Sequence, residues 1–168
     1  MSQRYTAIRK LAASDRTEGF DCGQPALNQF LQRYALVNQK AHNAQTYVCC
    51  QQDVVVGFYS LSVGSVQPQV APQRVMQGMA RHPVPVMLLA RLAIDLAHQR
   101  QGLGRALLRD ALLRTAQAAD IAGIRYLLVH AKDGAARRWY EGWEFEPSPT
   151  DSYHHLFLLL KDFKALVA

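Results

Sequence analysis

The stretch VMLLARLAI (Val86–Ile94), followed by the turn QRQGLG (Gln99–Gly104), decides the fold of this chain. An apolar run of this length predicts a strand. Gly102 and Gly104 remove side chains where the backbone enters the next helix, so that the first N–H groups of the helix can lie against a ligand. The helix dipole favours an anion at that end. The turn therefore predicts a phosphate-binding site.

A long amphipathic helix follows the turn and extends to Ala122. At about 3.6 residues per turn, one half of the helical wheel carries Leu103, Leu107, Leu108, Ala111, Leu112, Ala118 and Ala119, and Arg109 lies on the other half. One face is therefore expected to pack on a sheet while the other meets water. Arg100 and Arg105 flank the turn and add positive charge where an anion would bind.

The composition predicts a globular protein with a basic surface. The sequence has 168 residues, 49% of them hydrophobic, which favours one domain over residues 1–168 with a substantial core. A net charge of +6 favours a polyanionic partner, because a basic surface attracts phosphates at long range. Cys22, Cys49 and Cys50 form no even disulfide framework, and neither a signal peptide nor a membrane-length apolar run is found. These features predict a cytoplasmic protein without a membrane span or a metal site.

The remaining segments predict a mixed α/β order. Strands are expected over Tyr5–Leu11, Thr46–Gln51, Val54–Val66, Arg125–Ala131 and His155–Leu160, and Trp143–Phe145 is expected to begin a further short strand. Helices are expected from Pro25 to about Asn43, from Asp133 to Gly142 and from Asp162 to Val167. The proline-rich segment between Val66 and Pro85 is expected to be irregular or briefly helical, either a substrate-facing loop or a plain surface excursion. This order suits one curved sheet with helices on both faces.

The turn and the order of elements resemble the GNAT acetyltransferases. The spacing Q-x-x-G-x-G at Gln99–Gly104 resembles the pyrophosphate motif of that family, R/Q-x-x-G-x-G/A, which holds acetyl-coenzyme A. Ala136–Phe145 resembles the family's segment in which a tyrosine precedes a Gly-aromatic pair. The resemblance implies the α/β GNAT fold, a single mixed curved sheet of about six to seven strands flanked by helices on both faces. It also implies an enzyme that transfers acetyl from acetyl-coenzyme A to an amine without a metal.

The resemblance implies roles for three groups of residues. Tyr140 takes the position of the general acid that protonates the departing thiolate, and a phenol with an ordinary pKa of about 10 is protonated at neutral pH. Backbone groups of Leu92, Ala93 and Ile94 are expected to hold the pantetheine arm and to polarise the thioester. The pyrophosphate is expected on Gln99, Arg100, Gln101, Gly102, Leu103, Gly104 and Arg105. No general base stands out among His98, His130, His154, His155, Glu141 and Asp95.

Four stretches further resemble the toxin branch of the family, the TacT-like acetyltransferases of bacterial toxin-antitoxin pairs. They are Phe20–Gly23 with the residues from Leu27 to Leu31, Val84–Asp95, the glycine turn and Trp139–Gly142. Asn28 and Trp143 depart from the aspartate and phenylalanine expected there, and neither change touches the proposed chemistry. The resemblance implies that the α-amine of charged tRNA is acetylated, which blocks translation. An α-amine has an ordinary pKa of about 7.7, so a useful neutral fraction exists without a base.

The same resemblance implies a ribbon-helix-helix antitoxin as partner. Operator DNA would then be bound only through the antitoxin complex, and a homodimer is one alternative for the oligomeric state. A basic path for the tRNA acceptor stem is predicted at Arg91, Arg33, Lys40, Arg74, Arg81, Arg137 and Arg138. Arg91 is the strongest candidate of this set, because a charged side chain within an apolar strand is costly unless it binds a ligand or a partner. The structural alternative is an ion pair with a carboxylate such as Asp95.

Two other functions stay open at this point. One is a GNAT enzyme that acts on a small amine or a protein N-terminus. The other is a non-catalytic module that binds coenzyme A or RNA. The loss of a general acid slows an enzyme by about 10²- to 10⁴-fold, whereas replacing Tyr140 in a binding module would change no phenotype.

Overall fold

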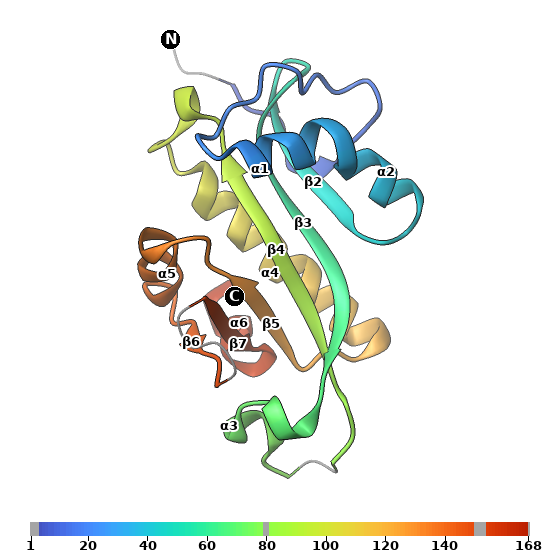
Figure 1. The fold of residues 1–168 in the computed structure, drawn as a ribbon, viewed down its shortest axis with the longest axis vertical. Helices are drawn as coiled ribbons and strands as arrows, with labels where there is room; N and C mark the ends of the chain where they lie inside the picture. The colour runs from blue at the N-terminus through green and yellow to red at the C-terminus, as the bar shows by residue number, and fades with distance from the viewer. Residues whose placement is uncertain (1–3, 79–80, 150–153, 168) are drawn as a thin grey trace. The chain divides into compact units, whose positions relative to one another are not determined.

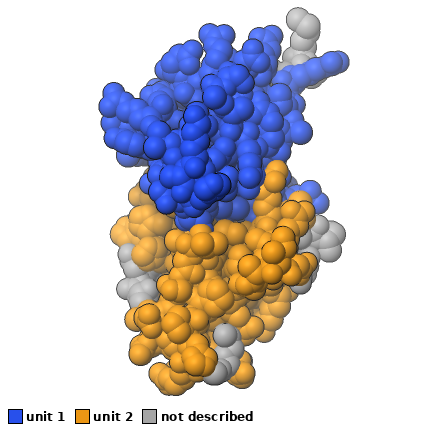
Figure 2. All heavy atoms as spheres, turned by 90° about the vertical axis from the view of Figure 1, so that its right-hand side faces the viewer, with its two compact units in different colours: residues 1–62, 91–111 blue, residues 63–90, 112–168 orange. Residues whose placement is uncertain are grey.

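A computed structural model describes residues 4–78, 81–149 and 154–167 of the chain (Figure 1). The chain divides into two compact units, coloured separately in Figure 2. Unit 1 comprises residues 1–62 and 91–111, and unit 2 comprises residues 63–90 and 112–168. Three elements contribute residues to both units, namely β3 (Val54–Val66), β4 (Val84–Ile94) and α4 (Leu103–Ala122). The single domain expected over residues 1–168 stays a prediction.

Within the described residues, seven strands form one mixed sheet in the order β1-β2-β3-β4-β5-β7-β6. The other strands are β1 (Arg9–Lys10), β2 (Gln45–Gln51), β5 (Tyr126–His130), β6 (Glu146–Pro147) and β7 (His155–Leu159). β4 and β5 are parallel, whereas β2 pairs antiparallel with β1 and β3, and β7 pairs antiparallel with β5 and β6. The predicted α/β class and mixed sheet are confirmed.

In unit 1, helices cover both faces of the sheet, as predicted. One helical segment lies in front of β2 and β3 in Figure 1 and consists of α1 (Pro25–Gln29), a π-helical turn (Phe30–Tyr34) and α2 (Ala35–Lys40). Phe30 from this segment packs in a buried cluster with Phe58 of β3. On the opposite face, a Cβ on Gly57 would lie 2.8 Å from Ile94 Cδ1 and 3.1 Å from Leu107 Cδ1, so α4 packs closely there.

In unit 2, the segment predicted to be irregular or briefly helical contains a 3₁₀ turn (Pro68–Val70) and α3 (Gln73–Met76). Val75 of α3 is fully buried in a cluster with Tyr126 and Phe157. The Arg125 guanidinium donates to the Val75 carbonyl from Nε at 3.3 Å and from Nη2 at 3.1 Å. These contacts fix α3 to the core of unit 2, which also carries α5 (Gly134–Glu141) and α6 (Leu160–Val167).

Two predicted strands differ from the structure. The strand expected over Tyr5–Leu11 is reduced to β1, where Arg9 lies opposite Val48. The short strand expected to begin with Trp143–Phe145 begins later, because the N–H groups of Trp143 and Phe145 donate to the Tyr140 carbonyl at 2.9 and 3.2 Å. Those N–H groups close the end of α5 and are not available to a sheet, so β6 begins only at Glu146.

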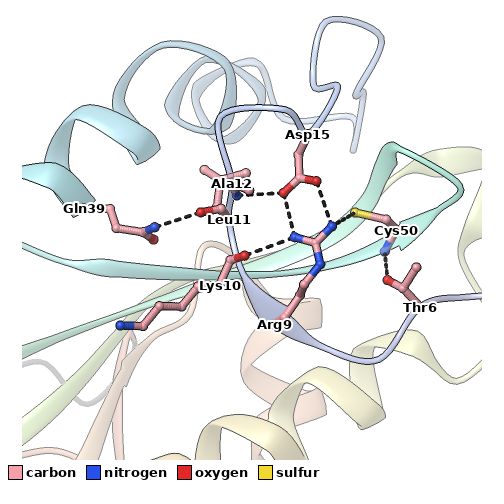
Figure 3. Close-up of polar contacts among 8 residues, drawn as sticks. All are labelled: Thr6, Arg9, Lys10, Leu11, Ala12, Asp15, Gln39 and Cys50. Carbon is pink, nitrogen blue, oxygen red and sulfur yellow. Dashed lines mark hydrogen bonds and ion pairs between the residues drawn. The ribbon is translucent and has the colours of Figure 1, made fainter.

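An ion pair stabilises the segment that follows β1 (Figure 3). Arg9 donates from Nη1 and Nη2 to the two carboxylate oxygens of Asp15, each at 2.8 Å, and the Ala12 N–H donates to the same carboxylate at 2.8 Å. The Asp15 side chain is only 4% exposed. The hydrogen bond from Arg9 holds the pKa of Asp15 below its ordinary value. Arg9 Nη2 also lies 3.9 Å from Cys50 Sγ on β2, which ties the segment to the sheet.

None of the helices in the described part of the chain combines the length and the apolarity that crossing a bilayer requires.

Candidate active site

The predicted phosphate turn lies between β4 and α4, in unit 1. Arg100 and Gly102 adopt left-handed backbone, with φ of 63° and 82°, and a Cβ on Gly102 would meet no atom within 4 Å. The Ala106 N–H donates to the Gly102 carbonyl at 3.1 Å, so the N–H groups of Leu103 and Gly104 precede the first N–H group that donates within the helix. The turn thus presents backbone donors beside open space, which is the arrangement that a pyrophosphate needs.

Two glutamines of the turn bond to the protein through their side chains. Gln99 Nε2 donates to the Ile94 carbonyl at 3.0 Å, and the Tyr5 hydroxyl donates to Gln101 Oε1 at 2.7 Å. The same hydroxyl is bonded to His98 Nδ1 at 2.9 Å. Gln99 and Gln101 therefore hold the turn in place within unit 1 through their amide groups.

The residues expected to bind pantetheine lie at the carboxyl end of β4. The ladder between β4 and β5 begins with Val86 opposite Tyr126 and includes pairs up to Leu89 opposite Val129. β4 extends beyond these pairs to Ile94, and this extension carries Leu92, Ala93 and Ile94 in unit 1. A 3₁₀ turn (Leu96–His98), capped by Asp95, separates this extension from the phosphate turn, and both predicted groups of coenzyme-binding residues belong to unit 1.

Tyr140 lies on α5, in unit 2. Asp133 caps this helix by accepting the Ala136 N–H at 2.8 Å. The Tyr140 ring is buried, with its centroid 5.1 Å from that of Trp139 and 5.3 Å from that of Phe145. Burial raises the pKa of Tyr140 above its ordinary value.

The hydroxyl of Tyr140 has no hydrogen-bond partner in the part of the chain that the structure describes. The O–H group is therefore not engaged by another described group, although the ring is buried. A phenol that stays protonated and whose O–H is available has the properties of a general acid.

Arg91 lies over an aromatic ring in unit 1. Its Cζ is 3.8 Å from the centroid of the Phe30 ring, and burial lowers its pKa. The alternative ion pair with Asp95 is not formed. The Asp95 carboxylate instead accepts the backbone N–H groups of Asp21 at 3.0 Å and Ala97 at 2.9 Å. Arg91 is thus a cation without a carboxylate partner among the described residues.

The other basic residues predicted to bind tRNA fall into two classes. Arg74 pairs with Glu146 and Asp162, and Arg137 pairs with Glu141 at 3.1 Å. Exposed side chains without an ion pair among the described residues are those of Arg33, Lys40, Arg81 and Arg138. Arg33, Lys40 and Arg91 belong to unit 1, whereas Arg74, Arg81, Arg137 and Arg138 belong to unit 2.

The distribution of carboxylates along the sequence is a signal that the sequence analysis missed. Between Asp21 and Asp95 the chain has a single acidic residue, Asp53. The same segment carries Arg33, Lys40, Arg81 and Arg91, which have no ion pair among the described residues, and Arg74, which pairs with carboxylates outside it. Because lone cations attract phosphates more strongly than paired ones, this segregation points to the polyanion-binding segment.

Four of the candidate general bases have a neighbour that the structure shows directly. Glu141 pairs with Arg137, and the His130 ring lies 5.5 Å from that of His154 and 4.9 Å from that of His155. No group of three or more His, Cys, Asp or Glu in the described residues has the geometry to hold a metal.

Comparison with known proteins identifies the family. Residues 42–147 match the model of the acetyltransferase (GNAT) domain. A "tRNA-acetylating toxin" of Mycobacterium tuberculosis (strain ATCC 25618 / H37Rv) is 46% identical over 163 residues, which cover 97% of each chain. A "Probable toxin TacT" of Sinorhizobium fredii (strain NBRC 101917 / NGR234) is 28% identical over 141 residues, 78% of each chain.

Solved structures with the same fold include toxins in several complexes. AtaT complexed with acetyl-methionyl-tRNAfMet has a TM-score of 0.89 at 27% identity, over 98% of this chain and 100% of that one. A tyrosine-to-phenylalanine mutant of AtaT, bound to the C-terminus of the antitoxin AtaR and acetyl-CoA, has a TM-score of 0.83 at 28% identity, over 96% and 97%. The KacTA-DNA complex contains a chain with a TM-score of 0.82 at 27% identity, over 97% and 98%. The chain is therefore an acetyltransferase of the GNAT family, and its relatives in that family include tRNA-acetylating toxins.

Proposed function

We propose that this chain is a toxin that transfers acetyl from acetyl-coenzyme A to the α-amino group of aminoacyl-tRNA and so blocks translation. The observation that carries this proposal is the 46% identity, over 97% of both chains, with the tRNA-acetylating toxin of M. tuberculosis. The cations of the acid-poor segment between Asp21 and Asp95 support an RNA substrate, because RNA is bound largely through its phosphates.

In the proposed mechanism, the turn holds the pyrophosphate through backbone N–H groups, and the end of β4 holds the pantetheine arm and polarises the thioester. The residues of these two sites are Leu92, Ala93, Ile94, Gln99, Arg100, Gln101, Gly102, Leu103, Gly104 and Arg105. The neutral α-amine attacks the acetyl carbon, and the C–S bond breaks. Tyr140 Oη gives its proton to the departing thiolate sulfur, the excess proton on the new amide nitrogen passes to solvent, and Tyr140 regains a proton from solvent.

The proposal extends to the partners. AtaT and KacT have been solved with an antitoxin or with DNA, which supports an antitoxin partner for this chain as well. We propose that this antitoxin is of ribbon-helix-helix type, that operator DNA is bound through the toxin-antitoxin complex, and that the toxin forms a homodimer. The substrate pool of charged tRNA places the activity in the cytoplasm.

Transfer of labelled acetyl from acetyl-coenzyme A to a pool of charged bacterial tRNA tests the function. We expect label on aminoacyl-tRNA from the wild type and a rate about 10²- to 10⁴-fold lower from Tyr140→Phe, with acetyl-coenzyme A binding retained. Tyr126→Phe is the matched control, because Tyr126 is also a buried tyrosine of unit 2, in the core and outside the proposed site. Label on small amines or peptides but not on tRNA would show that the proposal is wrong.

A further inference from the structure

A cavity of about 560 Å³ opens beside α3 in unit 2. Its lining includes the side chains of Gln69, Gln73, Gln77 and Arg81, together with Pro68 and Met76, and none of the described residues that line it carries a carboxylate. Pockets of roughly 300 to 1,000 Å³ hold ligands the size of a nucleotide. The cavity therefore has the size for one nucleotide, and its described lining is uncharged or positive.

The lining has the chemistry to bind both parts of a nucleotide. A glutamine amide offers a carbonyl acceptor and an NH₂ donor side by side, which is the pattern that pairs with the edge of a nucleobase. Arg81 is exposed and has no ion pair among the described residues, so its guanidinium is available to a phosphate. Unpaired nucleotides are the part of RNA that proteins recognise through base edges.

A second cavity of unit 2, of about 540 Å³, provides a contrast. Its lining includes Glu144, Glu146 and Asp162, and its Arg74 pairs with two of these carboxylates, Glu146 and Asp162. Carboxylates repel a polyanion and already neutralise the arginine. The two cavities are similar in volume, so the carboxylates of the second cavity are the difference between them, and of these two the cavity beside α3 is the better suited to RNA.

The wall of the cavity beside α3 is held in place before any ligand binds. Val75, between Gln73 and Met76 on the lining, is fully buried in the core of unit 2. Arg125 fixes the backbone of the same residue through its two bonds to the Val75 carbonyl. A fixed wall lowers the entropy cost of binding, which favours a ligand site over a loosely packed surface.

We propose that this cavity holds an unpaired nucleotide of the tRNA substrate, with the glutamine amides on the base and Arg81 on a phosphate. The inference rests on the proposed function, because it assigns one part of the same substrate. It predicts that the loop between β3 and β4 contributes to tRNA affinity and leaves the chemical step unchanged.

Measurement of tRNA affinity over a range of salt concentrations tests the inference. We expect Arg81→Gln to weaken binding about 3- to 10-fold and to reduce the slope of log K against log[salt] by about one. The double variant Gln73→Ala/Gln77→Ala should weaken binding about 10-fold at an unchanged slope, because it removes no charge. Arg109→Gln is the control, since Arg109 is an exposed arginine of α4 outside the cavity.

The outcomes separate this inference from the proposed function. If the wild type acetylates charged tRNA while all variants bind tRNA with wild-type affinity and slope, the cavity assignment is wrong and the proposed function stands. If the variants lose antitoxin binding or self-association and keep tRNA affinity, the cavity belongs to a protein contact and the assignment is again wrong. A wild type that neither binds nor acetylates tRNA would overturn both.

Discussion

At the scale of the residue, Arg91 best shows how a contact distant in sequence assigns a role to a side chain. The Phe30 ring covers one face of its guanidinium, at 3.8 Å from Cζ, and no carboxylate neutralises it among the described residues. A guanidinium stacked on a ring keeps its N–H groups in its own plane, where they can donate to a phosphate. Arg91 is thus suited to an anionic ligand and needs no partner for stability of the fold.

We expect Arg91→Gln to lower kcat/KM for charged tRNA about 5- to 20-fold, through KM, because it removes one desolvated cation. Arg91→Glu, which reverses the charge, should abolish tRNA acetylation. Acetyl-coenzyme A binding, measured by calorimetry, should stay at the wild-type value in both. Arg109→Glu supplies the same charge reversal on the exposed face of α4 and should lose far less activity. Wild-type kinetics in Arg91→Glu would exclude this residue from the tRNA site.

At the scale of the element, the turn between β4 and α4 depends on one backbone conformation. Gly102 has φ of 82°, and open space surrounds the position of a Cβ. We expect Gly102→Ala to lower the free energy of unfolding by about 1 to 2 kcal/mol, which is the cost of left-handed backbone for a residue with a Cβ. The variant should also weaken acetyl-coenzyme A binding at least about tenfold, because the methyl group would occupy the position of the phosphate. Urea unfolding and calorimetry measure the two effects.

Gly123→Ala is the matched control for this prediction. Gly123 follows α4, has φ of 77° and also shows no atom within 4 Å of a Cβ. It should lose similar stability and keep its coenzyme affinity. Equal affinity in the two variants would remove Gly102 from the pyrophosphate site.

The elements that the sequence predicts well are those with long internal periodicity. The helix from Leu103 to Ala122 and the hairpin strands up to Val66 follow from local pattern alone, because many residues repeat the same signal. The two-residue strands β1 and β6 do not, since only their partner strands define them.

The same limit applies to the prediction of the site. The motif located the turn and Tyr140, but the pairing of Arg74 with Glu146 and Asp162 joins residues far apart in the sequence.

At the scale of the whole molecule, the net charge of +6 is unevenly distributed along the chain. Only one acidic residue lies between Asp21 and Asp95, whereas Asp15 and Glu18 precede this segment. A carboxylate outside this segment can stabilise the fold through its hydrogen bonds. The clearest case is Asp15, which accepts two hydrogen bonds from Arg9 and one from the Ala12 N–H.

The Asp15 pair makes the stability of the protein depend on pH in one direction. Because Arg9 lowers the pKa of Asp15 in the folded state, the contribution is present above the ordinary aspartate pKa of about 3.9 and is lost as the pH falls below it. We expect Asp15→Asn to lower the free energy of unfolding by about 1 to 3 kcal/mol at pH 7, and the gap to the wild type to shrink towards pH 3. Urea unfolding from pH 3 to pH 7 measures this gap. Asp120→Asn, at an exposed site on α4, is the control and should have the same free energy of unfolding as the wild type at both ends of this range. If the difference between Asp15→Asn and the wild type is the same at pH 3 and pH 7, packing and not the charge of Asp15 stabilises the segment.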